Sequence, residues 1–152
     1  MASRRRAREF ALQALFQADI TGTPGGEALA ALWDGLLDAD GLGDARPPEA
    51  DEVAFATRLV DGVVRDHEAI DALIEGSSTN WRLSRMPVVD RNILRMACFE
   101  LRSAPDVPAT VTINEAVELA KTYGSGESRA FVNGIVDRVA RQLGRLNEAR
   151  RG

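Results

Sequence analysis

The chain has 152 residues, of which 45% are apolar and 28% are charged, a composition that suits one compact domain with a hydrophobic core. With five Phe, two Trp and one Tyr, an aromatic-rich all-β architecture is not expected. The single cysteine, Cys98, excludes an internal disulfide and a cysteine-cluster zinc site. The single histidine, His67, argues against the usual metal sites and catalytic triads, so we expect no metal, no cofactor and no enzyme chemistry.

The net charge of −4 conceals a strong asymmetry along the chain. Residues 1–8 carry four Arg and no acid, residues 9–80 carry a net charge of −12, and residues 81–152 carry a net charge of +4. If the two basic ends meet in the fold, they form a basic face on an acidic body. An ordinary solvated surface would explain the same pattern.

No apolar run approaches the roughly 20 residues that span a bilayer. The basic N-terminus is not followed by the apolar stretch of a secretory signal. We therefore expect a cytoplasmic protein that makes no membrane contact.

Apolar residues recur at three- and four-residue spacing through the first part of the chain, which predicts helices. The first helix is expected over residues 3–20, ended by the Gly- and Pro-rich segment 22–26. A second helix has an apolar stripe over residues 29–37, and a surface loop is expected over residues 38–48.

Residues 51–75 keep the helical period, as one helix or as two nearly in line, with Gly62 as the weak point. Residues 76–79 have the composition of a loop. His67 falls in step with the apolar stripe, which favours a core or boundary residue over a catalytic base. Cys98 falls on the apolar face of a later helix and is expected to pack as a small hydrophobic residue.

Three further helices are expected in the second half of the chain. Pro87 suits the first turn of one helix. Thr112 and Glu115 have the spacing of a capping box, which would start a helix that ends at Gly124. Ser128 is the expected N-cap of the last helix, and the tail from residue 145 is expected to fray. About seven helices with short connections predict a helical bundle with one core, either undivided or in two halves of three to four helices each.

Two segments favour RNA as a ligand. Residues 4–8 put several guanidinium groups on the first turns of a helix, where they could straddle a nucleic-acid backbone, although an unstructured solubilising end has the same composition. The turn at residues 124–128 leads into a helix N-terminus, which favours an anion. Cations and rings flank that turn and suit single-stranded RNA, although Phe131 fits a core position equally well: Lys121, Tyr123, Arg129 and Phe131. Glu115 and Glu118 share a helix face without forming an acid–base pair.

Four motifs in order along the chain resemble the bacterial NusB family of transcription antitermination factors. They are residues 4–9 with 14–16, residues 89–95, residues 107–108 with 113–121, and residues 131–137. The resemblance covers residue 4 to about residue 139 and is weakest between residues 20 and 51. It implies one all-helical domain over residues 1–152, built from two packed helical bundles.

The resemblance also implies a function. NusB proteins pair with a small-subunit ribosomal protein, NusE, and bind the boxA element of nascent RNA, so that RNA polymerase passes terminators in ribosomal RNA operons. Carried over by motif, the RNA face would comprise Arg4, Arg5, Arg6, Arg8, Lys121, Tyr123, Glu127, Ser128, Arg129 and Phe131. The face toward NusE would comprise Phe16, Asp90, Arg91 and Arg95. As an acid, Glu127 would orient a neighbour or accept from a base edge.

Two alternatives remain open. NusB-like helical domains also resemble the N-terminal parts of some RNA cytosine methyltransferases, but this chain has no Rossmann-like βαβ pattern. A helical homodimer without a specific RNA role is the other alternative, and a dimer would also be compatible with RNA binding.

Overall fold

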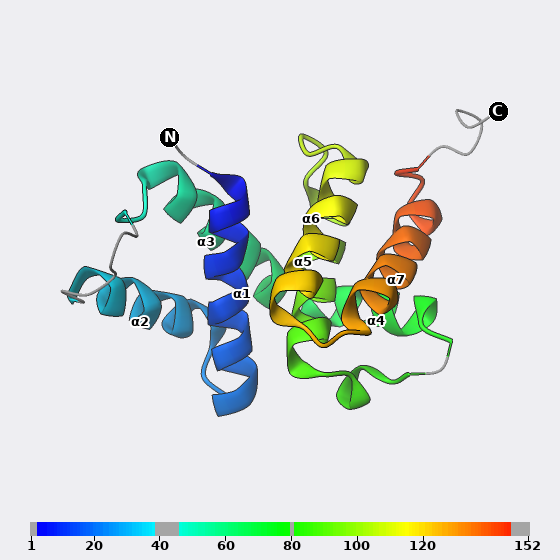
Figure 1. The fold of residues 1–152 in the computed structure, drawn as a ribbon, viewed down its shortest axis with the longest axis horizontal. Helices are drawn as coiled ribbons and strands as arrows, with labels where there is room; N and C mark the ends of the chain where they lie inside the picture. The colour runs from blue at the N-terminus through cyan, green and yellow to red at the C-terminus, as the bar shows by residue number, and fades with distance from the viewer. Residues whose placement is uncertain (1–2, 39–45, 80, 147–152) are drawn as a thin grey trace. The chain divides into compact units, whose positions relative to one another are not determined.

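The structure, a computed structural model, describes residues 3–38, 46–79 and 81–146. None of these residues lies in a strand, which confirms the predicted all-α class. The chain divides into two compact units, residues 1–65 with α1 to α3 and residues 66–152 with α4 to α7 (Figure 1). The described elements are α1 (Arg4–Thr21), α2 (Gly25–Asp38), α3 (Ala50–Arg65), α4 (His67–Ser77), the 3₁₀ helix η1 (Leu83–Arg85), α5 (Val88–Ser103), α6 (Ala109–Tyr123) and α7 (Ser128–Gln142).

Helix α1 is capped at both ends, and it ends at Gly22, in the segment that the sequence predicts to end it. The Ser3 hydroxyl accepts a hydrogen bond from the Arg6 N–H at 3.1 Å, which satisfies one of the amides that a helix start leaves without a partner. Gly22 ends the helix at φ 75°, a left-handed conformation that glycine adopts without steric cost. Within the first unit, α1 packs against both α2 and α3.

Helix α2 begins earlier than expected. Gly25 and Gly26, which we expected to belong to the connection, are its first residues. A Cβ at Gly25 would lie 2.7 Å from a methyl carbon of Val64 and 3.2 Å from one of Val60. Glycine therefore lets the start of α2 approach α3, and close packing is the physical reason for this residue. Part of the expected loop, residues 39–45, lies outside the described residues.

The long periodic stretch is divided into α3 and α4. The division lies at Asp66, whereas Gly62, the expected weak point, is buried inside α3. Helix α4 extends to Ser77, two residues into the expected loop. His67 opens α4 and is exposed, so the expectation of a core or boundary histidine was wrong.

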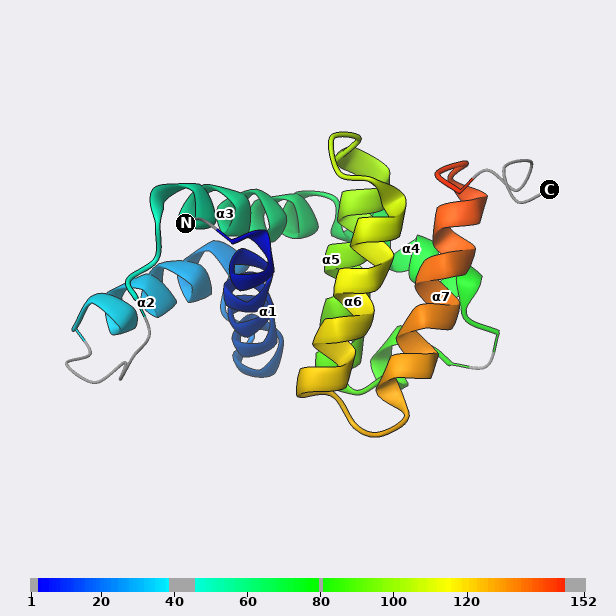
Figure 2. The same cartoon turned by 45° about the horizontal axis from the view of Figure 1, so that its top comes forward.

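In the second unit, α5 is the central helix and packs against α4, α6 and α7 (Figure 2). Pro87 is its N-cap residue, close to the predicted position. None of the helices in the described part of the chain has the length and hydropathy needed to cross a membrane. The buried residues of α5 include both apolar and polar side chains: Asp90, Asn92, Ile93, Leu94, Met96, Ala97, Cys98, Phe99, Glu100 and Leu101.

The capping box predicted at Thr112 is not formed. Helix α6 begins three residues earlier, at Ala109 after Pro108. The Thr112 hydroxyl is buried and donates to the Glu100 carboxylate at 3.2 Å instead of capping its own helix. Thr112 therefore bonds to a side chain of α5 instead of capping its own helix. The predicted end of α6 at Gly124 is confirmed.

The end of the described chain is fixed by Arg145. Its guanidinium donates to the Leu101 carbonyl at 2.5 Å and to the Val107 carbonyl at 2.7 Å. These carbonyls lie at the end of α5 and in the connection to α6, so the arginine supplies partners for oxygens that a helix end leaves open. The expected fraying therefore does not begin at Arg145; residues 147–152 lie outside the described residues.

Cys98 gives a direct test of the core of the second unit. The thiol is fully buried, and burial, followed by the negative charge of Asp71, raises its pKa to about 12. Because the thiolate is the reactive form, we expect the native protein to resist iodoacetamide at neutral pH and to react at once in denaturant. Mass spectrometry of timed samples would measure this, and rapid labelling of the native protein would contradict the packing described.

Candidate nucleic-acid interface

The four N-terminal arginines differ in exposure, although the sequence groups them together. Arg4 and Arg5 are exposed on the first turn of α1. The Arg6 side chain retains 19% of its surface, and Arg8 retains 3%. Of the four, only Arg4 and Arg5 are therefore exposed.

Glu52, on the first turn of α3, explains the position of Arg6. The Glu52 side chain is buried, and its Oε1 accepts from Arg6 Nη1 at 3.1 Å. Arg6 also donates to the backbone carbonyls of Pro47, at 3.2 Å, and of Arg46. The Arg6 guanidinium is thus engaged by a carboxylate and two carbonyls of its own unit.

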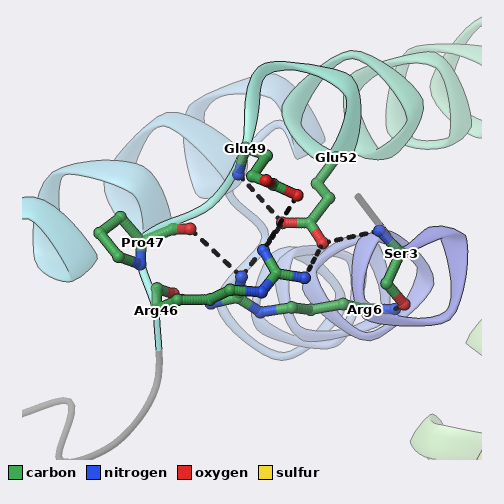
Figure 3. Close-up of polar contacts among 6 residues, drawn as sticks. All are labelled: Ser3, Arg6, Arg46, Pro47, Glu49 and Glu52. Atoms are coloured by element: carbon green, nitrogen blue, oxygen red, sulfur yellow. Dashed lines mark hydrogen bonds and ion pairs between the residues drawn. The ribbon is translucent and has the colours of Figure 1, made fainter. Parts of the chain in front are cut away.

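The Glu52 carboxylate also accepts hydrogen bonds from three further groups (Figure 3). Arg46 donates to both of its oxygens, at 2.9 and 2.7 Å, in the paired geometry that suits a guanidinium and a carboxylate. The backbone N–H of Ser3 donates to Oε2 at 2.9 Å, and that of Glu49 to Oε1 at 3.0 Å. Glu52 therefore joins the start of α1, the segment before α3, and the start of α3 itself.

These contacts keep Glu52 ionised. The hydrogen bond from Arg46 is the largest cause; together with the backbone N–H groups of Glu49 and Ser3 it outweighs the cost of burial and lowers the pKa of Glu52 from its ordinary value of 4.5 to about 2. The negative charge sits near the N-terminal ends of α1 and α3, where exposed helix amides favour an anion.

Phe55 is surrounded by arginines. The guanidinium carbon of Arg4 lies 4.4 Å from the Phe55 ring centroid, that of Arg8 5.2 Å and that of Arg58 6.0 Å, within the range of cation–π contacts. An open cleft of about 550 Å³ lies beside them and is lined by Ser3, Arg4, Asp51, Glu52, Ala54, Phe55 and Arg58. The buried Arg8 thus packs beneath a surface that Arg4 and Arg58 line.

Sequence reasoning did not find the residues that organise this surface. Glu52, Arg46 and Arg58 were counted only as charges of the acidic middle segment. An acid at the third position of a helix is a local capping signal that could have singled out Glu52. Its contacts with Ser3 and Arg6 bridge 49 and 46 residues of sequence, so no local pattern could have found them.

The predicted RNA residues of the second unit lie around the end of α6 and the start of α7. Lys121, Glu127 and Arg129 are exposed, and Tyr123 retains 41% of its surface. Phe131 is half-buried. Lys121 and Tyr123 thus lie at the end of α6, before the turn at residues 124–128, and Arg129 and Phe131 lie at the start of α7, after it.

Ser128 and Asp90 were expected on different faces, yet they contact each other. The Ser128 hydroxyl donates to Asp90 Oδ1 at 2.7 Å and accepts from the Ser125 N–H at 2.9 Å. Both residues are buried, so their side chains fix the starts of α7 and α5 rather than reach a ligand. Burial raises the pKa of Asp90, and the hydrogen bond from Ser128 partly opposes that effect. The N-cap of α7 is Glu127, not Ser128 as predicted.

A close approach at Gly124 completes this arrangement. A Cβ there would lie 2.5 Å from both Cβ and Oγ of Ser128 and 2.8 Å from the Ala120 carbonyl oxygen. Glycine is therefore the residue that lets the turn fold onto the start of α7.

The other residues expected to face a protein partner remain partly exposed. Phe16 is half-buried on α1. Arg95 donates to both carboxylate oxygens of Asp71, at 2.9 and 3.3 Å, and to Asn92 at 3.1 Å. Arg91 donates to the Leu83 carbonyl at 3.5 Å. Within the residues that the structure describes, no cluster of His, Cys, Asp or Glu is arranged to hold a metal ion.

The chain matches the family model described as "NusB family" over residues 5–141. The chain belongs to the NusB family. This finding confirms the resemblance seen in its motifs. Transcription antitermination protein NusB of Myxococcus xanthus (strain DK1622) is 49% identical over 140 residues, which cover 92% of this chain and 96% of that protein.

Solved NusB structures share the fold. A structure of T. maritima NusB matches with a TM-score of 0.80 and 34% identity, over 96% of this chain and all of that one. A chain from a structure of the antitermination factors NusB and NusE in complex with dsRNA matches with a TM-score of 0.76 and 27% identity, over 91% of this chain and 96% of that one.

The Glu52 cluster gives a prediction for stability. Glu52→Gln keeps the shape but removes the charge, and we expect it to lower the free energy of unfolding at neutral pH by about 2 kcal/mol. The pKa of Glu52 is about 2 in the folded state and 4.5 in the unfolded chain. The stability that its charge contributes is therefore complete above pH 4.5 and disappears as the pH falls from 4.5 to 2. Urea unfolding across that pH range would measure the difference between wild type and variant.

Glu49→Gln is the matched control for this prediction. Glu49 pairs with Arg46 at 3.3 Å, but both side chains retain 40% of their surface, so we expect a loss below about 0.5 kcal/mol. Equal losses in the two variants, or a difference that does not shrink in acid, would refute the role assigned to Glu52.

Proposed function

We propose that this protein is a non-catalytic RNA-binding adaptor of transcription antitermination that acts in the cytoplasm. It binds the boxA element of ribosomal RNA transcripts together with the ribosomal protein NusE and helps RNA polymerase pass terminators. Membership of the NusB family carries the proposal. A structural relative that was solved as NusB and NusE with dsRNA supports both kinds of partner.

In this proposal the exposed cations contact RNA and the buried ones hold the surface in shape. Arg4 and Arg5 of the first unit, and Lys121 and Arg129 of the second, are exposed and suit phosphate contacts. Arg6 is engaged by Glu52, and Arg8 packs under Phe55. We therefore assign Arg6 and Arg8 a positioning role. In the second unit, Tyr123 and Phe131 offer rings to unstacked bases. Glu127 is exposed in the turn before α7, and the buried Ser128 supports that turn.

The two exposed arginines of α1 provide the main test. We expect Arg4→Ala with Arg5→Ala to weaken binding of boxA RNA by about tenfold and to reduce the slope of log K against log salt by roughly 1.4, because two phosphate contacts are lost from a single strand. Fluorescence anisotropy at several salt concentrations, with and without NusE, would measure both quantities.

Arg65→Ala with Arg102→Ala is the matched control, since it removes the same charge from two other exposed positions. We expect this variant to keep the wild-type salt slope. If the two double variants lose affinity and slope equally, binding reflects only the total charge, and the proposed face is wrong.

The partner face is also a proposal. Phe16 of the first unit is partly exposed and suits a protein contact. In the second unit, Arg91 and Arg95 are also partly exposed and suit such a contact, while the buried Asp90 supports the start of α5 through Ser128. Aromatic side chains often carry much of the binding energy at an interface.

We expect Phe16→Ala to weaken NusE binding by about tenfold in calorimetry, because a partly exposed ring is lost from the contact. Gln17→Ala, at the exposed neighbouring position, should leave the affinity unchanged. Unchanged NusE affinity in Phe16→Ala would remove Phe16 from the interface.

A further inference from the structure

Trp81 is a large aromatic residue with half of its surface exposed. It precedes η1 in the second unit and retains 50% of its accessible surface. Its backbone N–H donates to the Ser78 hydroxyl at 3.2 Å, which fixes the chain at this point. Exposure of so large a ring is uncommon in a side chain that serves only the core, so the indole is a candidate contact for a ligand.

Phe131, on α7, holds the indole from one side. The two ring centroids lie 6.5 Å apart at an interplanar angle of 80°, an edge-to-face contact that adds to the stability of an aromatic pair. The residues are 50 positions apart in the sequence, so the fold itself assembles this pair. The Trp81 ring is thereby oriented before any ligand arrives.

A pocket of about 210 Å³ opens beside the two rings. On the α7 side it is lined by Ala130, Gly134 and Ile135. A Cβ at Gly134 would meet no atom within 4 Å, so this side of the pocket has space that a side chain does not fill. The pocket therefore combines two aromatic walls with an open helix surface.

A guanidinium group lines the pocket beside the rings. Arg138 lines it, and its guanidinium is positioned by donating to the Ser77 carbonyl at 2.9 Å. Arg82, which follows Trp81 directly, is exposed. Rings beside a cation match the flat base and the phosphates of a single-stranded nucleic acid, whereas an apolar peptide side chain has no use for a guanidinium group in its pocket.

We propose that Trp81 and Phe131 form a pocket for one unstacked base of single-stranded RNA, with the lining Arg138 as the cation for an adjoining phosphate. The inference rests on the proposed function and deepens it, because it adds Trp81 as a base-stacking residue to a surface previously described by its cations and by Tyr123 and Phe131. Phe131 then has two roles, as a wall of the pocket and as the support of the indole.

Tryptophan fluorescence can report on the pocket directly. The chain has two tryptophans, and Trp33 lies in the first unit against Phe10, with ring centroids 5.1 Å apart. In Trp33→Phe, Trp81 is the sole tryptophan. Titration with a boxA RNA oligonucleotide should quench its emission, because a stacked base quenches an indole. A series of oligonucleotides, each with one abasic site at a different position, locates the bound base. Only the oligonucleotide that lacks this base should fail to quench the emission.

Affinity gives the second readout. We expect Trp81→Ala to bind the oligonucleotide at least about fivefold more weakly with an unchanged salt slope, because a stacking contact is lost and no phosphate contact is removed. Trp81→Phe should recover part of the affinity, and Trp33→Phe is the matched control with wild-type affinity. Thermal unfolding followed by circular dichroism establishes that each variant is folded.

The outcomes separate this inference from the function on which it rests. Suppose that the wild type binds RNA and that the Arg4 and Arg5 variant has a reduced salt slope. If Trp81 fluorescence is then not quenched by RNA and Trp81→Ala keeps its affinity, the pocket is refuted and the function stands. Quenching by NusE without RNA would show that a protein occupies the pocket and would also refute it. Failure of the wild type to bind RNA, with NusE present, would overturn both.

Discussion

The first unit depends on one buried negative charge. The Glu52 carboxylate accepts hydrogen bonds from the backbone at Ser3 and Glu49 and from the guanidinium groups of Arg6 and Arg46. A buried carboxylate is costly unless it is paired, and here two arginines and two amides surround it. The start of α1 must therefore meet the segment that leads into α3, 46 to 49 residues away in sequence, for the charge to be tolerated, which makes the start of α1 part of the fold.

This arrangement divides the basic N-terminus by function. Guanidinium groups that bind a carboxylate or pack on a ring build a surface, whereas those that extend from it can exchange solvent counterions for phosphates. Arg6 belongs to the first kind, whereas Arg4 combines both, because it lies over the Phe55 ring and is still exposed. A rigid base for the exposed arginines also lowers the entropic cost of ordering them on RNA.

Much of the helical plan was predictable because its signals are local. The start of α1 near Ser3, its end at Gly22 and the end of α6 at Gly124 involve neighbouring residues, and each was predicted from sequence. The failures share a physical cause, which is a partner supplied by another segment. Thr112 serves Glu100 instead of its own helix, and Ser128 serves Asp90. Burial of Arg8 likewise depends on tertiary packing, which periodicity alone does not reveal.

The hydrogen bond between Ser128 and Asp90 has a consequence for genetics. These residues were assigned to two different binding surfaces, yet each is buried and each is the other's partner at 2.7 Å. Loss of either side chain leaves a buried polar group without its partner and loosens the starts of both α5 and α7. A mutant screen would therefore recover both positions with the same mixed phenotype, and suppressors would arise at the opposite member of the pair. A binding surface inferred from such phenotypes would include Ser128 and Asp90, although both side chains are buried and stabilise the fold.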